Sequence, residues 1–168
     1  MSKSKIVAMM ALIAFAIGIL LVGNAVAGEK FKARNAYHSV KWEQVNVGDE
    51  EGHVVAVYES KAITTNLEGK WFSDGSVERN TGLWDINLKT GLGSVHGYGE
   101  MTDKDGNKYY YRMEGKVVEP GKPTKGVWTI LKGTGKFEGI KGKGTWEYYP
   151  LGPGEGYSNW EIEVELPR

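Results

Sequence analysis

The chain has 168 residues, with 21 basic and 21 acidic side chains, 40% hydrophobic residues and no cysteine. The balanced charge lacks the basic footprint of nucleic-acid binding and argues equally against a strongly charged partner surface. Without disulfides the folded part must be stabilised by burial, to which six tryptophans can contribute large areas.

The first residues carry the pattern of an export signal. Lys3 and Lys5 precede an uncharged apolar run over residues 6–22, and the small residues Ala25-Val26-Ala27 follow it. This order predicts a signal peptide over residues 1–27 and cleavage after Ala27. Export would use the general secretory route, giving a periplasmic or secreted protein with no further membrane contact. A retained anchor is the alternative, although the run is at the short end of the roughly 17–25 residues that span a bilayer.

Alternation of apolar and polar residues dominates residues 28–168, which have the length of one domain. The segments 108–118 and 159–166 alternate most clearly and predict half-buried strands. Weaker strand candidates are residues 37–45, 53–59, 62–67, 83–89, 92–101, 127–132 and 142–149. This pattern predicts an all-β domain of eight or nine strands in a closed antiparallel β-barrel, because closure removes exposed edges.

Turn signals separate several of these strands. Residues 103–107 read Asp-Lys-Asp-Gly-Asn and predict a hairpin, since the glycine is misplaced for a calcium loop and no acid closes one. Residues 119–123 predict another turn, and residues 151–156 predict a longer flexible loop before the last strand.

The segment GTGKFEGIKGKGTW, residues 133–146, holds five glycines in fourteen residues. It lacks the Gly-Lys-Ser/Thr of a phosphate loop and the glycine spacing of a dinucleotide fingerprint, and a strand pattern follows where a helix would be needed. We therefore expect the glycines to serve sheet geometry. Phe137 is expected to enter the core, residues 138–141 to turn, and Gly142 and Gly144 to leave room for neighbouring tryptophans.

This segment resembles the penultimate-hairpin signature of the allene oxide cyclase and dirigent-like β-barrel superfamily, including its bacterial members. The resemblance is strong over about fourteen residues and is topological elsewhere. It implies an eight-stranded antiparallel barrel with a central cavity, in a family whose members cyclise or couple apolar small molecules or have no assigned activity. The family's catalytic side chains lie outside the segment, so no catalytic residue is carried over.

Five aromatic residues lie on the faces expected to point inward, and they either fill the core or form the wall of a site for a flat apolar ligand. They are Tyr109, Tyr111, Trp146, Tyr148 and Trp160.

Two further residues are candidates for the lumen. His96 shares a polar strand face with Glu100, and an inward orientation would allow acid/base chemistry, although the glycines on the opposite face favour an outward one. Glu59 shares a face with Val55 and Val57, and a solvent-exposed strand end is its alternative. The histidines have no metal-ligand spacing, so we expect no metal and no cofactor.

Three functional hypotheses follow. The first is an exported barrel that binds a small apolar or aromatic molecule in its lumen without turnover. The second is a cofactor-free cyclase or isomerase, which requires an inward ionisable group in a cavity of drug-like volume. The third is an envelope protein that binds another protein through its outer surface, which exposed aromatics in residues 151–157 or around Trp71-Phe72 would favour. Association into a homo-oligomer stays an open alternative.

Overall fold

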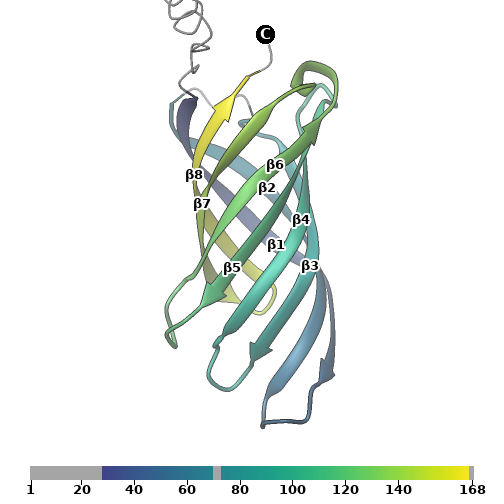
Figure 1. Cartoon of the computed structure of the whole chain (residues 1–168), viewed down its shortest axis with the longest axis vertical. Helices are drawn as coiled ribbons and strands as arrows, with labels where there is room; N and C mark the ends of the chain where they lie inside the picture. The colour runs from purple at the N-terminus through teal and green to yellow at the C-terminus, as the bar shows by residue number, and fades with distance from the viewer. Residues whose placement is uncertain (1–27, 70–72, 167–168) are drawn as a thin grey trace, which may run out of the picture.

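The computed structural model describes residues 28–69 and 73–166 and consists of antiparallel strands around one axis (Figure 1). The predicted signal peptide over residues 1–27 lies outside the described residues, as does Trp71-Phe72. The elements in chain order are β1 Glu29–Asn46, β2 His53–Glu68, β3 Val77–Asn87, β4 Gly93–Thr102, β5 Lys108–Val117, β6 Thr124–Gly133, the single 3-10 turn η1 Gly135–Phe137, β7 Lys141–Gly152 and β8 Glu155–Glu165. In this part of the chain no helix is long and apolar enough to cross a membrane.

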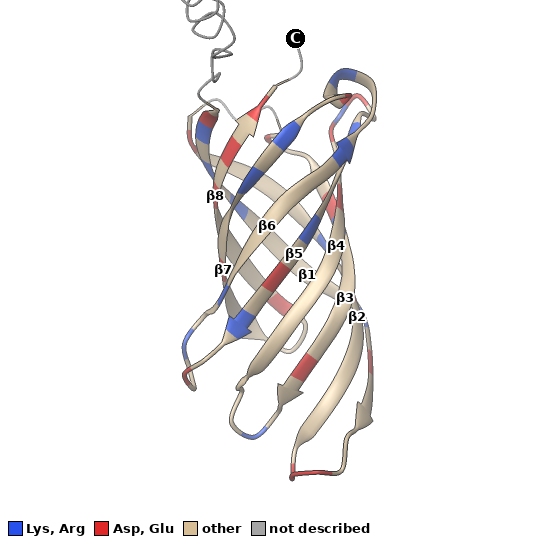
Figure 2. Cartoon of the chain, in the orientation of Figure 1, with Lys and Arg blue, Asp and Glu red and all other residues tan. Residues whose placement is uncertain are grey.

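The strands follow one another around the sheet, and β8 pairs with β1 to close an eight-stranded barrel. This confirms the predicted all-β closed barrel. Strand alternation places one set of side chains inside, as in β8, where Trp160, Ile162 and Val164 are buried and the glutamates between them are exposed. Basic and acidic residues are interspersed over the strands and loops (Figure 2).

Three strands differ from the prediction. The segments 53–59 and 62–67 are one continuous strand, β2, while β1 and β3 both begin earlier than expected. The strand bounds were mispredicted because part of the inner face is polar. Asn35, Ser60 and Glu78 point inward and are buried. Polar residues at core positions hide the alternation by which strands are recognised.

The predicted long loop over residues 151–156 is also wrong. Gly152 of β7 still pairs with Glu155 of β8, so only Pro153 and Gly154 form the tip of a tight hairpin. Gly154 has a φ of 74°, a conformation that glycine adopts without steric penalty.

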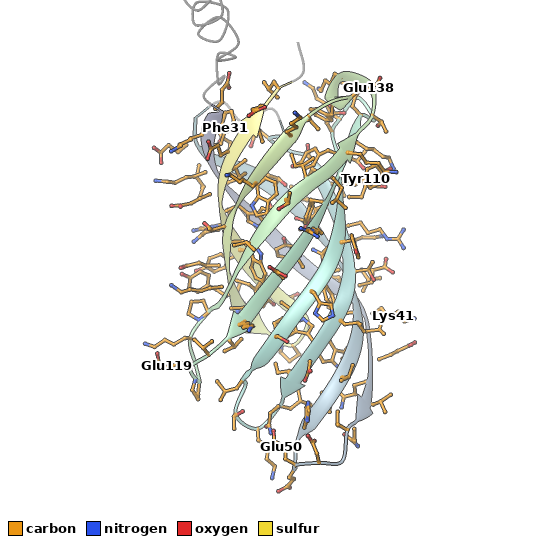
Figure 3. All side chains as sticks on the ribbon, in the orientation of Figure 1. Phe31, Lys41, Glu50, Tyr110, Glu119 and Glu138 are labelled. Atoms are coloured by element: carbon orange, nitrogen blue, oxygen red, sulfur yellow. The ribbon has the colours of Figure 1, made fainter. Side chains whose placement is uncertain are left out.

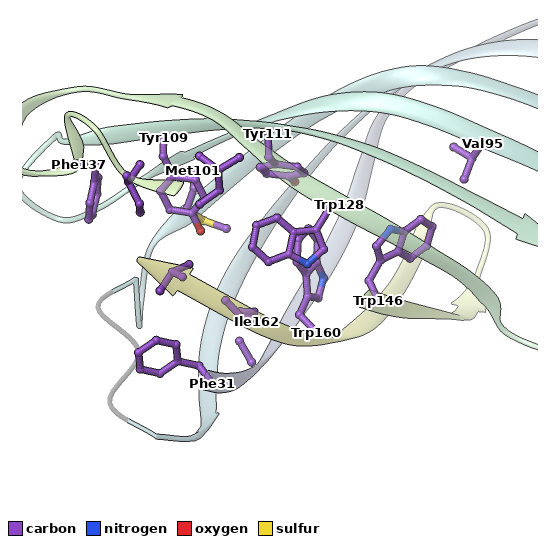
Figure 4. Close-up of a cluster of buried hydrophobic side chains, with 14 of the residues drawn as sticks. Phe31, Val95, Met101, Tyr109, Tyr111, Trp128, Phe137, Trp146, Trp160 and Ile162 are labelled. Atoms are coloured by element: carbon purple, nitrogen blue, oxygen red, sulfur yellow. The ribbon is translucent and has the colours of Figure 1, made fainter. Parts of the chain in front are cut away.

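The glycine segment serves the sheet as expected. It forms a single 3-10 turn and then strand β7, rather than an α-helix whose amides could hold a phosphate. Phe137 is 2% exposed and packs edge-on against Tyr109, at 5.6 Å between ring centroids. Figure 4 shows Phe137, Tyr109 and Phe31 at one end of the buried cluster and Trp146 and Val95 at the other. The first end is plugged by side chains.

A bulge in β1 decides which residues reach the opposite end of the barrel. Ser39 pairs with Ser60 and Lys41 pairs with Glu59, so Val40 is the additional residue. The additional residue shifts the alternation of side chains by one position. Trp42 therefore points to the same side of the sheet as the odd-numbered residues before the bulge.

Candidate functional site

A cavity of about 730 Å³ occupies the half of the barrel away from the plug. Gly91, Gly121 and Gly154, from the β3–β4, β5–β6 and β7–β8 turns, line its mouth. These turns lie at the end where Figure 3 labels Glu50 and Glu119, opposite the end that carries Phe31 and Glu138. The cavity is thus a lumen open at one end, of the size that holds a drug-like molecule.

Aromatic side chains form most of the cavity wall. The tryptophans that line it are Trp42, Trp84, Trp146 and Trp160, and the tyrosines are Tyr37, Tyr58 and Tyr148. Glycines make room for them: a Cβ atom at Gly115 or Gly126 would lie 2.5 Å from the Trp146 ring. The small/large alternation expected for this barrel therefore shapes the cavity.

A polar floor separates the cavity from the plugged end. Its residues are Tyr37, Ser60, Asn80 and Ser158, which line the cavity and lie over the carboxyl group of Glu78. Glu78 itself is fully buried. Its carboxylate accepts hydrogen bonds from Tyr37 Oη at 2.9 Å and from Asn80 Nδ2 at 2.8 Å, and also from Asn35 Nδ2 and Tyr111 Oη.

These four donors are the number that an ionised carboxylate accepts, and all four are neutral. Burial raises the pKa of Glu78 above its ordinary value, and the four hydrogen bonds, which favour the ionised form, oppose this shift without cancelling it. Burial, together with the charge of Glu78, also raises the pKa of Tyr37 and of Tyr111 well above its ordinary value. Both phenols therefore stay protonated and act as donors.

Further hydrogen bonds extend this network along the floor. Trp160 Nε1 donates to Ser158 Oγ, which lies 3.4 Å from Tyr37 Oη, and Ser60 Oγ donates to Asn80 Oδ1 at 2.8 Å. Buried polar groups that are connected in this way hold one another in fixed orientations. The floor is thus a rigid polar surface beneath an aromatic chamber.

The structure separates the sequence-derived candidates into three groups. Trp146, Tyr148 and Trp160 line the cavity. Tyr109 and Tyr111 point inward but are buried in the core, where Tyr111 packs edge-on against Trp160 at 5.4 Å between centroids. A ligand-binding role for any of the five stays a prediction.

His96 and Glu59 do not lie in the lumen, which corrects their selection as lumen candidates. His96 is exposed on the outer face of β4, and the inner face there belongs to Val95, Gly97 and Gly99. Glu59 lies on the outer face of β2, where it forms an ion pair with Arg79 at 2.8 Å. Crowding inside the barrel favours valine and glycine at the inward positions of β4, so His96 points outward, and on β2 the inward positions beside Glu59 belong to Tyr58 and Ser60.

The buried carboxylate was missed by reasoning from the sequence, as were its amide partners. Glu78 and Asn80 alternate with Val77 and Arg79 in a stretch that has no apolar face. The only available signal was that Glu78 and Asn80 lie on the same face of the strand as Trp84 and Ile86, because all four are at even-numbered positions. Trp84 and Ile86 line the cavity.

No group of three or more histidine, aspartate or glutamate side chains gathers as a metal site within residues 28–69 and 73–166. Residues 103–107 form the predicted hairpin between β4 and β5. Asp103 Oδ1 accepts hydrogen bonds at 2.9 Å from the backbone amides of Asp105 and Asn107. Burial of Asp103 raises its pKa, but the Lys136 ammonium and these donors outweigh burial and bring the pKa to about 2.

A solved structure shows the same architecture. The pterocarpan synthase dirigent protein GePTS1 superimposes with a TM-score of 0.52 at 13% identity, covering 88% of this chain and 94% of that one. The fold is that of a dirigent-type barrel. A second pterocarpan synthase dirigent protein, PsPTS1, gives a TM-score of 0.48 at 11% identity over 84% of this chain and 98% of that one. No family model and no curated protein sequence matches the chain.

Proposed function

We propose that this protein binds a small, largely apolar or aromatic molecule in the lumen of its barrel, without turnover. The observation that carries the proposal is the cavity of about 730 Å³, which is open at one end and walled by tryptophan and tyrosine side chains. A wall of this kind offers a flat apolar ligand a large contact area, and the polar floor offers hydrogen bonds to one end of it. The ligand would reach the floor through the mouth between the hairpin turns.

The test is saturable binding of the neutral fluorescent probe N-phenyl-1-naphthylamine. Val95 is 2% exposed and lines the cavity, so Val95→Trp places an indole in the space that the probe needs. We expect this variant to bind at least about tenfold more weakly than the wild type. Ile63→Trp, on the outer face of β2 at a position that is 59% exposed, is the matched control and should bind normally. Equal binding by both variants would place the probe outside the lumen and contradict the proposal.

One observation favours a second candidate, a cofactor-free cyclase or isomerase. Glu78 is an inward ionisable group, and the hydroxyl of Tyr37 links it to the cavity. Such a pair could stabilise charge or move a proton while the walls hold a flexible substrate in a reactive shape. Mass spectrometry of a bound molecule before and after incubation separates the two functions, because binding alone leaves its structure unchanged.

A further inference from the structure

Within residues 28–69 and 73–166, no ion pair joins the ionised form of Glu78, which its four donors favour, to a lysine, arginine or histidine. Its hydrogen-bond donors are the amides of Asn35 and Asn80 and the phenols of Tyr37 and Tyr111. Neutral donors satisfy the lone pairs of a carboxylate but leave its net charge in place. The field of this charge extends into the lumen, because Tyr37 and Asn80 each contact Glu78 on one side and the cavity on the other.

The aromatic walls of the cavity, like the carboxylate of Glu78, favour a positively charged ligand. The faces of tryptophan and tyrosine rings carry negative electrostatic potential and attract organic cations, most strongly where water is excluded. Four tryptophans line the cavity, and among them Trp146 and Trp160 are each 5% exposed. A positive group between these rings would thus be stabilised by the walls as well as by the carboxylate beneath the floor.

Among the described residues that line the cavity, the single charged one is Lys122, in the β5–β6 turn. Its ammonium lies at the mouth, 4.0 Å from Glu119, with 61% of its side chain exposed, so solvent screens it from the floor. Asp49, Glu50 and Glu51 form the tip of the β1–β2 hairpin at the same end (Figures 2 and 3). Lys89 of the β3–β4 turn forms an ion pair with Glu51, so acidic and basic side chains offset one another and the approach to the lumen is not strongly basic.

We infer that the lumen selects an organic cation, such as a quaternary ammonium or a protonated amine carried on an apolar or aromatic body. This inference rests on the proposed binding function and names the class of its ligand. The cationic group would lie over the floor, and the apolar body would lie among the aromatic walls. A carboxylate or sulfonate would meet the charge of Glu78 with no basic group to offset it, and would be rejected.

The experiment compares three probes of nearly the same shape by calorimetry: benzyltrimethylammonium, the uncharged neopentylbenzene and the anion benzylsulfonate. We expect the cation to bind at least about tenfold more tightly than the sulfonate. The affinity of the cation should also equal or exceed that of the hydrocarbon, although the transfer of a cation out of water costs more free energy. Equal binding of cation and sulfonate, or binding of the hydrocarbon alone, would overturn the inference and leave the proposed function intact. Failure of all three probes to bind would overturn both.

Two variants locate the source of the selectivity. Glu78→Gln removes the charge with little change of shape, and the preference for the cation over the sulfonate should fall by about tenfold. Glu161→Gln removes a glutamate from the outer face of β8 and should leave the preference unchanged. Should Glu78→Gln not fold, Trp84→Leu tests the walls, because it should weaken the cation more than the hydrocarbon. An unchanged preference for the cation over the sulfonate in a folded Glu78→Gln variant would contradict the inference. If Trp84→Leu is used in its place, equal weakening of the cation and the hydrocarbon would contradict it.

Discussion

Tyr37 stands between Glu78 and the lumen: its hydroxyl lies 2.9 and 3.0 Å from the two carboxylate oxygens, and the residue also lines the cavity. The ring of Tyr37 meets that of Tyr148 edge-on, at 6.1 Å between centroids. One side chain thus belongs both to the polar floor and to the aromatic wall. Tyr37 and Asn80 thus both connect the carboxylate of Glu78 to the surface of the cavity.

The first prediction concerns this contact. Tyr37→Phe removes one of four donors to a buried carboxylate, so we expect the free energy of unfolding to fall by about 2 kcal/mol. Urea denaturation at neutral pH measures the change. Tyr98→Phe, at an outer position that is 63% exposed, is the control and should leave stability within about 0.5 kcal/mol of the wild type. A Tyr37→Phe variant as stable as this control would show that the hydrogen bond to Glu78 contributes nothing.

The second prediction tests the glycine segment. A Cβ atom at Gly144 would lie 2.8 Å from Trp128 Nε1 and would also collide with the carbonyl oxygen of Glu161. Gly144→Ala should therefore lower the free energy of unfolding by about 1–3 kcal/mol or more. Gly152→Ala, whose Cβ atom would meet nothing within 4 Å, is the matched control. Equal stability of the two variants in thermal denaturation would refute the role of close packing at Gly144.

The third prediction concerns the pH dependence of stability. His53 Nδ1 lies 2.6 Å from Asp49 Oδ1 and His53 Nε2 lies 2.7 Å from Asp85 Oδ1, an arrangement in which both ring nitrogens donate only when the imidazole is protonated. The hydrogen bond to Asp85, followed by that to Asp49, raises the pKa of His53 above 6.5. The stabilisation is therefore complete below pH 6.5 and is lost as the pH rises through the folded-state value.

Thermal denaturation between pH 5.5 and 9 measures this effect as the difference between the wild type and His53→Gln. The difference in Tm should be largest at the acidic end and should shrink as the pH rises. His96→Gln, on the outer wall, serves as the control. A difference that stays constant or grows with pH would contradict the assignment, because only a protonated ring bridges the β1–β2 turn to β3.

The fourth prediction concerns maturation, for which we propose export with cleavage after Ala27. Intact-mass measurement on protein recovered from the periplasm or medium of a bacterial host should give a chain that begins at Gly28. Ala27→Arg places a long charged side chain where a small residue is required and should leave a longer product. Recovery of the full-length wild-type chain from the membrane fraction would favour a retained anchor.

The sequence by itself determined the closed antiparallel barrel and the inward side of its apolar strands. Alternation is a local property, and in β5, in β7 and in β8 from Trp160 onward the inward positions hold aromatic, aliphatic, proline or glycine residues that can be read along the chain. The purpose of the glycine segment could also be predicted, because a phosphate loop needs a helix that the following residues cannot form.

Only the tertiary structure decided where the polar centre of the lumen lies. Asn35, Glu78 and Tyr111 come from β1, β3 and β5, and the closed sheet brings them together across its interior. Along the chain, inward polar residues look like surface residues, and for that reason β1, β2 and β3 were predicted too short or divided. A buried charge is stable only where several strands supply donors at once, and that condition exists only in the closed barrel.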